Sequence, residues 1–184
     1  MNSNTYFTAD HHMFHKNILK HCNRPFETIE EMNEKLIENW NGIIKKDNDV
    51  YYLGDFFITN KANKMIDVLS RLNGNIHLIK GNHDNIILKK KLHGYFKSIQ
   101  DYKELNFEGR KYVLCHFPIL SFNGMHRGSY HLHGHSHGSI NYLNINIPRL
   151  DVGVDCHNYT PISLEQVNDL LKDRVFQPVD HHGQ

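Results

Sequence analysis

Residues 76–84, Ile-His-Leu-Ile-Lys-Gly-Asn-His-Asp, join a short apolar run to side chains of metal-binding types. The run predicts a β-strand over 76–79, and Gly81 opens the loop that follows it. Glycine lets the backbone pass close to a crowded cation, and the Asn-His-Asp that follows adds an amide, an imidazole and a carboxylate. This stretch therefore predicts a strand with candidate metal ligands at its carboxyl end.

Four further blocks of metal-binding residues lie along the chain, most of them at the end of a predicted strand. They are Asp10-x-His12, Gly54-Asp55, His116 and Gly134-His135-x-His137. Any one of them could arise by chance, whereas all five blocks in this order are a specific pattern. The candidate metal ligands are Asp10, His12, Asp55, Asn82, His116, His135 and His137. The total of 16 histidines also exceeds what packing normally requires and indicates metal or proton chemistry.

The first half of the chain alternates predicted strands and helices. Strands are predicted at 4–8, 50–53 and 76–79, and helices at 28–44, 61–72 and 85–92. Thr28-x-x-Glu31 is a capping box that opens the first helix, and Met65, Ile66 and Leu69 are expected to face inward from the second. Such alternation implies a parallel sheet covered by helices, with ligands gathered at the carboxyl ends of its strands.

The second half is predicted to be rich in strands. Residues 99–107 and 111–115 read as a hairpin, and further strands are expected at 130–132, 140–147 and 150–154. Ser163-x-x-Gln166 is expected to cap a last helix that runs to about residue 173. With 184 residues, 39% of them hydrophobic, the chain suits one domain over 1–176, followed by a loose tail over 177–184.

Charge and hydropathy exclude several classes of protein. A net charge of +1 without a long Lys/Arg block argues against a broad nucleic-acid footprint. No apolar run is long enough to span a bilayer, and the first residues lack the features of a signal peptide, so a cytoplasmic location without a membrane partner is expected. Three cysteines at unrelated spacings favour packing roles over a disulfide framework or a thiolate zinc site.

The blocks resemble the five motif blocks of the calcineurin-like metallophosphoesterase superfamily, and in particular its small single-domain bacterial and phage members. The resemblance runs from Tyr6 to about Ser163. It implies an α/β fold in which two packed β-sheets are flanked by helices, as a four-layer α-β-β-α sandwich. It also implies that one metal ion is held by Asp10, His12, Asp55 and His137, and the other by Asp55, Asn82, His116 and His135. Asp55 would bridge the two ions.

The resemblance implies a hydrolytic mechanism as well. A hydroxide that bridges the metals would attack phosphorus, and His83 would protonate the leaving group, with Asp84 as a candidate to orient it. The alternative for His83 is a loop histidine with a structural role. Two divalent ions and two carboxylates leave a charge of about +2, or about +1 with hydroxide. The mixed oxygen and imidazole ligands favour Mn²⁺, with Fe or Zn²⁺ as further possibilities, over Mg²⁺ or Ca²⁺.

Other polar residues have less certain roles. His15 and Arg24 follow the first block and are candidates for substrate binding, since an arginine can form a two-point contact with a phosphate. The alternative for Arg24 is a surface residue over Phe26. His133 is either a partner of the metal ligands or structural. Asp151, Asp155 and His157 are better explained as a polar loop edge than as residues that orient ligands.

Differences between this sequence and other branches of the superfamily limit the class of substrate that is expected. Residues 56–59, Phe-Phe-Ile-Thr, stand where phosphoprotein phosphatases carry an Asp-Arg-Gly extension, and their Gly-Asn-His-Glu is Gly-Asn-His-Asp here. The chain is also too short for the cap and DNA-binding domains of the repair nucleases. A small phosphodiester, either nucleotide-like or a cyclic nucleotide, is therefore the expected substrate, and monoesters remain open. The alternatives are a nuclease acting on DNA or RNA ends and a non-catalytic metal-binding scaffold.

Overall fold

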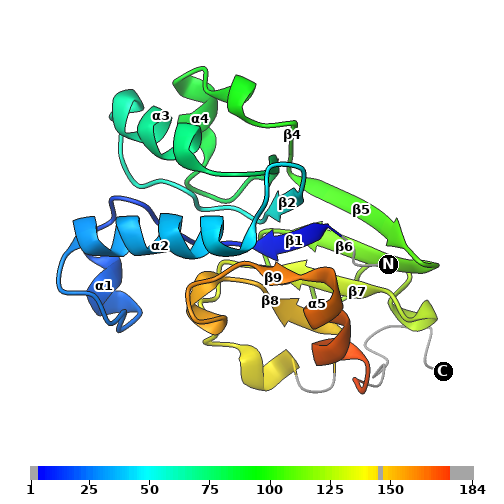
Figure 1. The fold of residues 1–184 in the computed structure, drawn as a ribbon. Helices are drawn as coiled ribbons and strands as arrows, with labels where there is room; N and C mark the ends of the chain where they lie inside the picture. Colours follow the sequence, from blue (N-terminus) through cyan, green and yellow to red (C-terminus); the bar gives the residue numbers. More distant parts are fainter. Residues whose placement is uncertain (1–3, 145–146, 175–184) are drawn as a thin grey trace.

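The computed structural model describes residues 4–144 and 147–174 (Figure 1). A five-stranded sheet has the order β4-β3-β2-β1-β9. Its parallel strands are β1 (Thr5–Thr8), β2 (Asp49–Tyr52), β3 (Asn75–Ile79) and β4 (Ser98–Gln100), and β9 (Ile162–Ser163) pairs antiparallel with β1. The predicted parallel sheet is therefore confirmed, and β9 is an additional strand that is too short to show a sequence period.

The second sheet has the order β5-β6-β7-β8. Its strands are β5 (Tyr102–Phe107), β6 (Arg110–Cys115), β7 (Tyr130–His133) and β8 (Arg149–Asp151). The antiparallel β5–β6 hairpin turns at Glu108 and Gly109, whose φ angles are 49° and 82°, and β6, β7 and β8 run parallel. The predicted hairpin is confirmed, but the prediction that residues 99–107 form a single strand is wrong. The chain leaves the first sheet after Gln100 and enters the second at Tyr102, because local alternation does not encode which sheet a residue joins.

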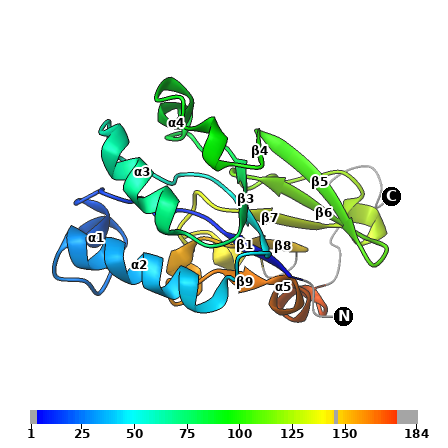
Figure 2. The ribbon, with the colours of Figure 1, turned by 45° about the horizontal axis from the view of Figure 1, so that its top comes forward.

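Helices cover the outer face of the first sheet (Figure 2). They are α1 (Ile18–His21), α2 (Ile29–Ile43), α3 (Ala62–Arg71) and α4 (Asn85–Lys89), with the short 3-10 helix η1 (His93–Tyr95) after them. The core beneath them contains Trp40, Val50 and Tyr52 of β2, and Ile76 and Leu78 of β3. The side chain of Thr28 caps α2 by accepting the Glu31 N–H, as predicted. The prediction for Ile66 is wrong, because it is 38% exposed and Val68 is buried in its place.

A second core fills the space between the two sheets. Phe7 and Tyr51 of the first sheet pack there with Tyr112 and Leu132 of the second. Helix α5 (Leu164–Leu171), which begins with the predicted Ser163–Gln166 capping box, closes the edge of this core. On the outer face of the second sheet, the 3-10 helix η2 (Met125–Arg127) packs in a third apolar cluster. The predicted architecture of two packed sheets flanked by helices is thus confirmed.

Of the two strands predicted near the end of the chain, the one over 140–147 is wrong, and the one over 150–154 is confirmed only at residues 150 and 151. Residues 141–144 form the 3-10 helix η3 (Asn141–Asn144), in which the Asn144 amide bonds to the Asn141 side chain, and residues 145 and 146 lie outside the described part. Asparagine side chains favour such local contacts over a strand ladder. Strand β8 ends at Asp151, and the 3-10 helix η4 (Val154–Cys156) follows. The predicted tail over 177–184 lies outside the described residues. Within them, no helix is long and apolar enough to cross a membrane.

Candidate metal centre

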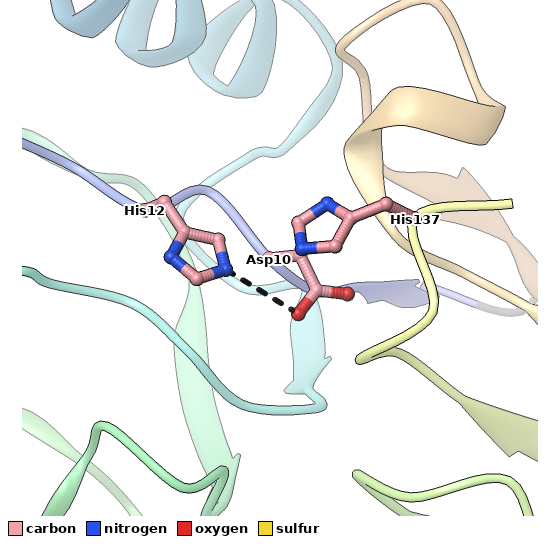
Figure 3. A group of neighbouring side chains, drawn as sticks. All are labelled: Asp10, His12 and His137. Atoms are coloured by element: carbon pink, nitrogen blue, oxygen red, sulfur yellow. Dashed lines mark ion pairs between the residues drawn. The ribbon is translucent and has the colours of Figure 1, made fainter. Parts of the chain in front are cut away.

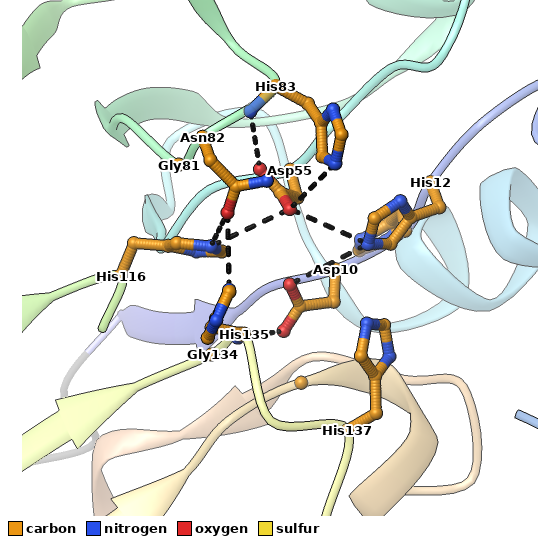
Figure 4. Close-up of polar contacts among 12 residues, drawn as sticks. Asp10, His12, Asp55, Gly81, Asn82, His83, His116, Gly134, His135 and His137 are labelled. Carbon is orange, nitrogen blue, oxygen red and sulfur yellow. Dashed lines mark hydrogen bonds and ion pairs between the residues drawn. The ribbon is translucent and has the colours of Figure 1, made fainter. Parts of the chain in front are cut away.

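The seven candidate ligands converge at one end of the two sheets (Figure 4). Asp10, Asp55 and Asn82 follow β1, β2 and β3, and His116 and His135 follow β6 and β7. Parallel strands bring their carboxyl ends to the same edge of a sheet, and the packing of the two sheets places these two edges together. The loops also bind one another, since the Asp10 N–H donates to the Gly54 carbonyl at 2.9 Å.

Asp10, His12 and His137 form the first ligand group (Figure 3). Their ligand atoms all lie within 4.8 Å of one another, and His12 Nε2 is 3.9 Å from Asp10 Oδ1. Both of these atoms are buried and have no hydrogen-bond partner among the described residues. Leaving a buried polar atom unpaired costs about 1–3 kcal/mol. A cation between the three side chains would satisfy them, so this group fits a metal ion.

Asp55, His116 and His135 form the second ligand group, and their ligand atoms also lie within 4.8 Å of one another. His116 Nδ1 is 2.8 Å from the Leu53 carbonyl, so this nitrogen is a donor and Nε2 carries the lone pair. Nε2 in turn lies 3.1 Å from Asn82 Oδ1, which is itself an acceptor. Two acceptors that face one another repel. A cation bound by both would remove this repulsion, so this group also fits a metal ion.

Asp55 faces both groups. Its Oδ2 lies 3.7 Å from His12 Nε2 and 3.6 Å from His116 Nε2, while its Oδ1 accepts the His83 N–H at 2.9 Å (Figure 4). A carboxylate oxygen in this position is available to ions on either side. The His83 ring is 47% exposed, with Nε2 3.9 Å from Asp55 Oδ2, so it lies at the mouth of the site and not inside either group.

Five of the candidate ligands have left-handed backbone conformations. The φ angles are 60° for Asp10, 49° for His12, 60° for Asp55, 68° for His135 and 47° for His137. Such conformations cost non-glycine residues on the order of 1–3 kcal/mol each and persist where the surrounding structure imposes them. This concentration of strain at one edge of the sheets indicates a functional site.

Asp84 holds one of these strained segments. It is fully buried, and its carboxylate accepts the N–H groups of Asp55 at 2.7 Å, Phe56 at 2.9 Å and Gly81 at 2.8 Å. The predicted role of Asp84 in orienting His83 is therefore wrong, because the described bonds of its side chain go to the backbone. Gly81 is required beside it, since a Cβ there would lie 2.2 Å from Asp55 Oδ1.

The pKa values of the candidate ligands depend on burial and on nearby charges. Burial, together with the charges of His137 and Arg24, lowers the pKa of His12 to about 2, and burial also lowers the pKa of His135. Both rings are therefore in the neutral form that binds metals. Burial acts in the same direction on His137, but the hydrogen bond from its Nδ1 to Asp155 and nearby carboxylates outweigh it and raise the pKa to about 10.

We expect metal uptake by the first ligand group to release protons. His137, with a pKa of about 10, is protonated at neutral pH in the metal-free protein, and burial raises the pKa of Asp10 in the same sense. Because a metal must displace the proton of His137, its affinity should rise with pH until about pH 10. Calorimetric titrations in two buffers of different ionisation enthalpy measure the release. An affinity that stays constant from about pH 6 to pH 9 would contradict the expectation.

The prediction that Arg24 binds a substrate phosphate is contradicted by its contacts. Its side chain is fully buried, and its acceptors are both carboxylate oxygens of Asp155, the carbonyls of Asp10 and His11, and the Met32 sulfur. These contacts occupy all five N–H donors of the guanidinium. The alternative of a surface residue is equally wrong. Nothing in the local sequence marks Arg24 as buried, because its partner Asp155 lies 131 residues away.

A cavity of about 670 Å³ opens beside the first ligand group. His15, the other predicted substrate-binding residue, lies in its wall, together with Ile18, His21, Pro118, Ser136 and Ile140. No Asp, Glu, Lys or Arg is among the described residues that line it. The cavity is therefore suited to an uncharged group with both polar and apolar parts.

Asp151 and Asp155 are predicted to form a polar loop edge, but the side chain of Asp151 is fully buried and that of Asp155 is nearly so, both of them beside the ligands. Asp151 accepts the Ser136 hydroxyl at 2.6 Å and the Gly138 N–H at 2.9 Å, so it braces the loop that carries His137. Asp155 accepts from His137 itself at 2.7 Å. The only sequence signal for the position of these two aspartates near the ligands was that they border a strand-like run, as the residues of the ligand blocks do. His133 is fully buried in β7, with Nδ1 on the Gly134 carbonyl and Nε2 without a hydrogen-bond partner among the described residues, so its role stays a prediction.

Comparison with known proteins shows similarity along nearly the whole chain. A family model described as calcineurin-like phosphoesterase matches residues 3–183. An uncharacterized protein of Methanocaldococcus jannaschii is 35% identical over 181 residues, which cover 95% of this chain and 96% of that protein. The gene 66 protein of Mycobacterium phage L5 is 33% identical over 84 residues, which cover 45% of this chain and 40% of that protein. The crystal structure of an Aquifex aeolicus protein of unknown function has a TM-score of 0.71 and 25% identity, covering 90% of this chain and 98% of that one.

Proposed function

Because the chain belongs to the calcineurin-like phosphoesterase family, we propose that it hydrolyses small phosphodiesters with the help of two divalent metal ions. The membership inferred from the motif blocks is confirmed over nearly the whole chain. The observation that carries the proposal is the position of Asp55, whose carboxylate lies within 3.7 Å of ring nitrogens from both ligand groups. Two adjacent groups that share a carboxylate are suited to a pair of ions.

The first ion would be held by Asp10, His12, Asp55 and His137, and the second by Asp55, Asn82, His116 and His135. When bound, such ions lower the pKa of a coordinated water and polarise phosphoryl oxygens. The mixture of imidazole and oxygen donors suits Mn²⁺, Fe or Zn²⁺, among which Mn²⁺ is our first choice. The ions and the two carboxylates Asp10 and Asp55 give the site a net positive charge, which attracts a phosphate ester.

His83 is proposed as the general acid for the leaving group. Its backbone N–H is bound by Asp55 Oδ1 at 2.9 Å, which fixes the residue beside the shared carboxylate. Its ring is about half exposed and belongs to neither ligand group, so it remains free to meet a substrate. A positioned imidazole that donates a proton to a departing oxygen contributes about 10²–10⁴-fold to the rate.

The cavity beside the first ligand group supports a small diester as substrate. Its lining offers imidazoles, hydroxyls and apolar surface, and His15 stands in its wall beside His12 at a ring distance of 5.6 Å. A nucleic-acid strand would bring further phosphates, which proteins neutralise with Lys and Arg. Since the described lining has neither, an uncharged substituent on the phosphate is the better match, and His15 is proposed to contact it.

We expect phosphodiesters to be cleaved with a higher kcat/KM than phosphomonoesters. A site that holds two divalent ions with the carboxylates of Asp10 and Asp55 would keep a small net positive charge, which matches the single charge of a diester. The test compares bis-p-nitrophenyl phosphate with p-nitrophenyl phosphate at equal Mn²⁺ concentration. A clear preference for the monoester would argue against the proposed substrate class. If neither substrate were turned over, a non-catalytic scaffold would be favoured.

A further inference from the structure

We propose that Arg24 and Asp155 are positioning residues that hold His137, and with it the first ligand group, in a metal-binding arrangement. The inference rests on the proposed metal centre and adds to it two residues outside the seven candidate ligands. Its basis is one continuous chain of buried contacts from Arg24 through Asp155 to His137.

Asp155 is the middle of this chain of contacts. Its Oδ1 accepts Arg24 Nε–H at 2.8 Å, and its Oδ2 accepts both an Arg24 terminal N–H at 2.8 Å and the His137 Nδ1–H at 2.7 Å. The side chain of Arg24 is fully buried and that of Asp155 is 7% exposed. Charge-assisted bonds of this kind are among the strongest in proteins and have narrow geometry, so the orientation of Asp155 is well defined.

The consequence for His137 is a defined tautomer and ring orientation. Nδ1 donates to Asp155, and the other ring nitrogen points toward Asp10 (Figure 3). When one nitrogen of a histidine is held as a donor to a carboxylate, the lone pair of the other is presented to a metal. Asp155 thereby directs the free nitrogen of His137 into the first ligand group.

Arg24 also holds the backbone of the same group. Its terminal nitrogens donate to the Asp10 carbonyl at 2.7 Å and the His11 carbonyl at 2.8 Å. These carbonyls flank the segment between Asp10 and His12, both of which have left-handed backbone conformations. A single guanidinium therefore holds Asp10 through its own carbonyl and His137 through Asp155, and it binds the His11 carbonyl in the peptide unit that leads into His12.

Two members of the second ligand group have supports of their own, while the backbone N–H of the third, His135, is bound by Asp10 Oδ2 at 2.8 Å. His116 is held by the Leu53 carbonyl, and the loop that carries Asp55 is held by Asp84. Loss of the Arg24–Asp155 contacts should therefore affect one metal ion and spare the other. The contacts also argue against a competing arrangement, in which Cys22, His137 and Asp155 would bind a metal themselves, because N–H donors already occupy both oxygens of Asp155.

The test is a calorimetric titration of the metal-free Asp155→Asn protein with Mn²⁺. Removal of a residue that orients a metal ligand typically weakens binding about 10–100-fold. We expect a loss of this size for one ion, with the affinity for the other unchanged within about twofold. His12→Ala should remove the same ion, and Arg24→Lys, which keeps the charge but loses the two-point contact, should weaken it in the same way. Asp155→Glu, which restores a carboxylate, should recover part of the affinity.

Glu34→Gln is the matched control. It breaks another arginine–carboxylate pair, the exposed contact between Arg71 and Glu34, and should leave both affinities unchanged. Wild-type affinity for both ions in Asp155→Asn would overturn the inference, as would an equal loss of both in a folded protein. If wild-type protein does not bind two ions, the proposed metal centre fails instead.

A second measurement on the wild-type chain covers the case in which the variants do not fold. Nitrogen-15 NMR of the histidine rings reports which nitrogen of His137 carries the proton in protein loaded with diamagnetic Zn²⁺. We expect the proton on Nδ1, where Asp155 accepts it. A proton on the other nitrogen would refute the positioning role.

Discussion

Asp55→Ala protein is expected to lose both metal ions and at least roughly 10³-fold in turnover. Asp55 lies between the two ligand groups, with Oδ2 3.7 Å from His12 Nε2 and 3.6 Å from His116 Nε2, so both proposed ions lose a ligand at once. Metal ions contribute several kcal/mol to such reactions, and each 1.36 kcal/mol corresponds to a factor of ten. Metal analysis after dialysis and kcat/KM on bis-p-nitrophenyl phosphate measure the two losses.

The controls for this prediction change one group at a time. His12→Ala should weaken mainly the first ion and His116→Ala mainly the second, because each ring belongs to only one ligand group. Circular dichroism before and after metal removal checks that the variants are folded. If Asp55→Ala protein kept both ions and normal turnover, the two-ion arrangement around this carboxylate would be wrong.

His83→Ala is expected to keep both ions and to lose about 10²–10⁴-fold in kcat/KM on an alkyl diester, the range attributed to general acid catalysis. The reason is the position of His83 at the mouth of the site, beside Asp55 and outside both ligand groups. An alkoxide needs a proton as it departs, whereas p-nitrophenolate hardly does. The variant should therefore lose much less activity on bis-p-nitrophenyl phosphate.

Paired rate measurements on a nucleoside alkyl diester and on bis-p-nitrophenyl phosphate separate this role from others. His83→Gln serves as a second variant that keeps a polar side chain without a comparable acid. Equal losses on the two substrates would indicate that His83 binds substrate and is not the acid. A reduced metal content in His83→Ala protein would instead place the ring among the ligands.

Several features of this protein follow directly from local sequence. An apolar run followed by a loop places its polar residues at a strand end, and parallel strands share that end, so the convergence of Asp10, Asp55 and Asn82 could be predicted. The capping residues Thr28 and Ser163 act within one turn and marked the start of their helices correctly. Each of these features depends on neighbours a few residues away, which the sequence displays.

Other features depend on contacts between distant segments. Residues 99–107 are predicted as one strand, yet residues 98–100 and 102–107 belong to different sheets, because the choice of partner strand is made by packing. Arginine is a residue type that usually lies at the surface. Arg24 is nevertheless buried, because Asp155 and the Asp10 and His11 carbonyls accept hydrogen bonds from its guanidinium.

By itself, the sequence determined the family and the set of side chains that meet at the site, since each block carries its own ligand types and its own strand-to-loop transition, and the resemblance to the family then implied the two-sheet architecture. Only the tertiary structure decided how those side chains are held. The left-handed backbone at the ligands, the three N–H groups on Asp84 and the hydrogen bond from His137 to Asp155 all require partners from separate loops. The physical reason is that hydrogen bonds are short and directional, so a bond between residues far apart in the chain exists only once both sheets have packed.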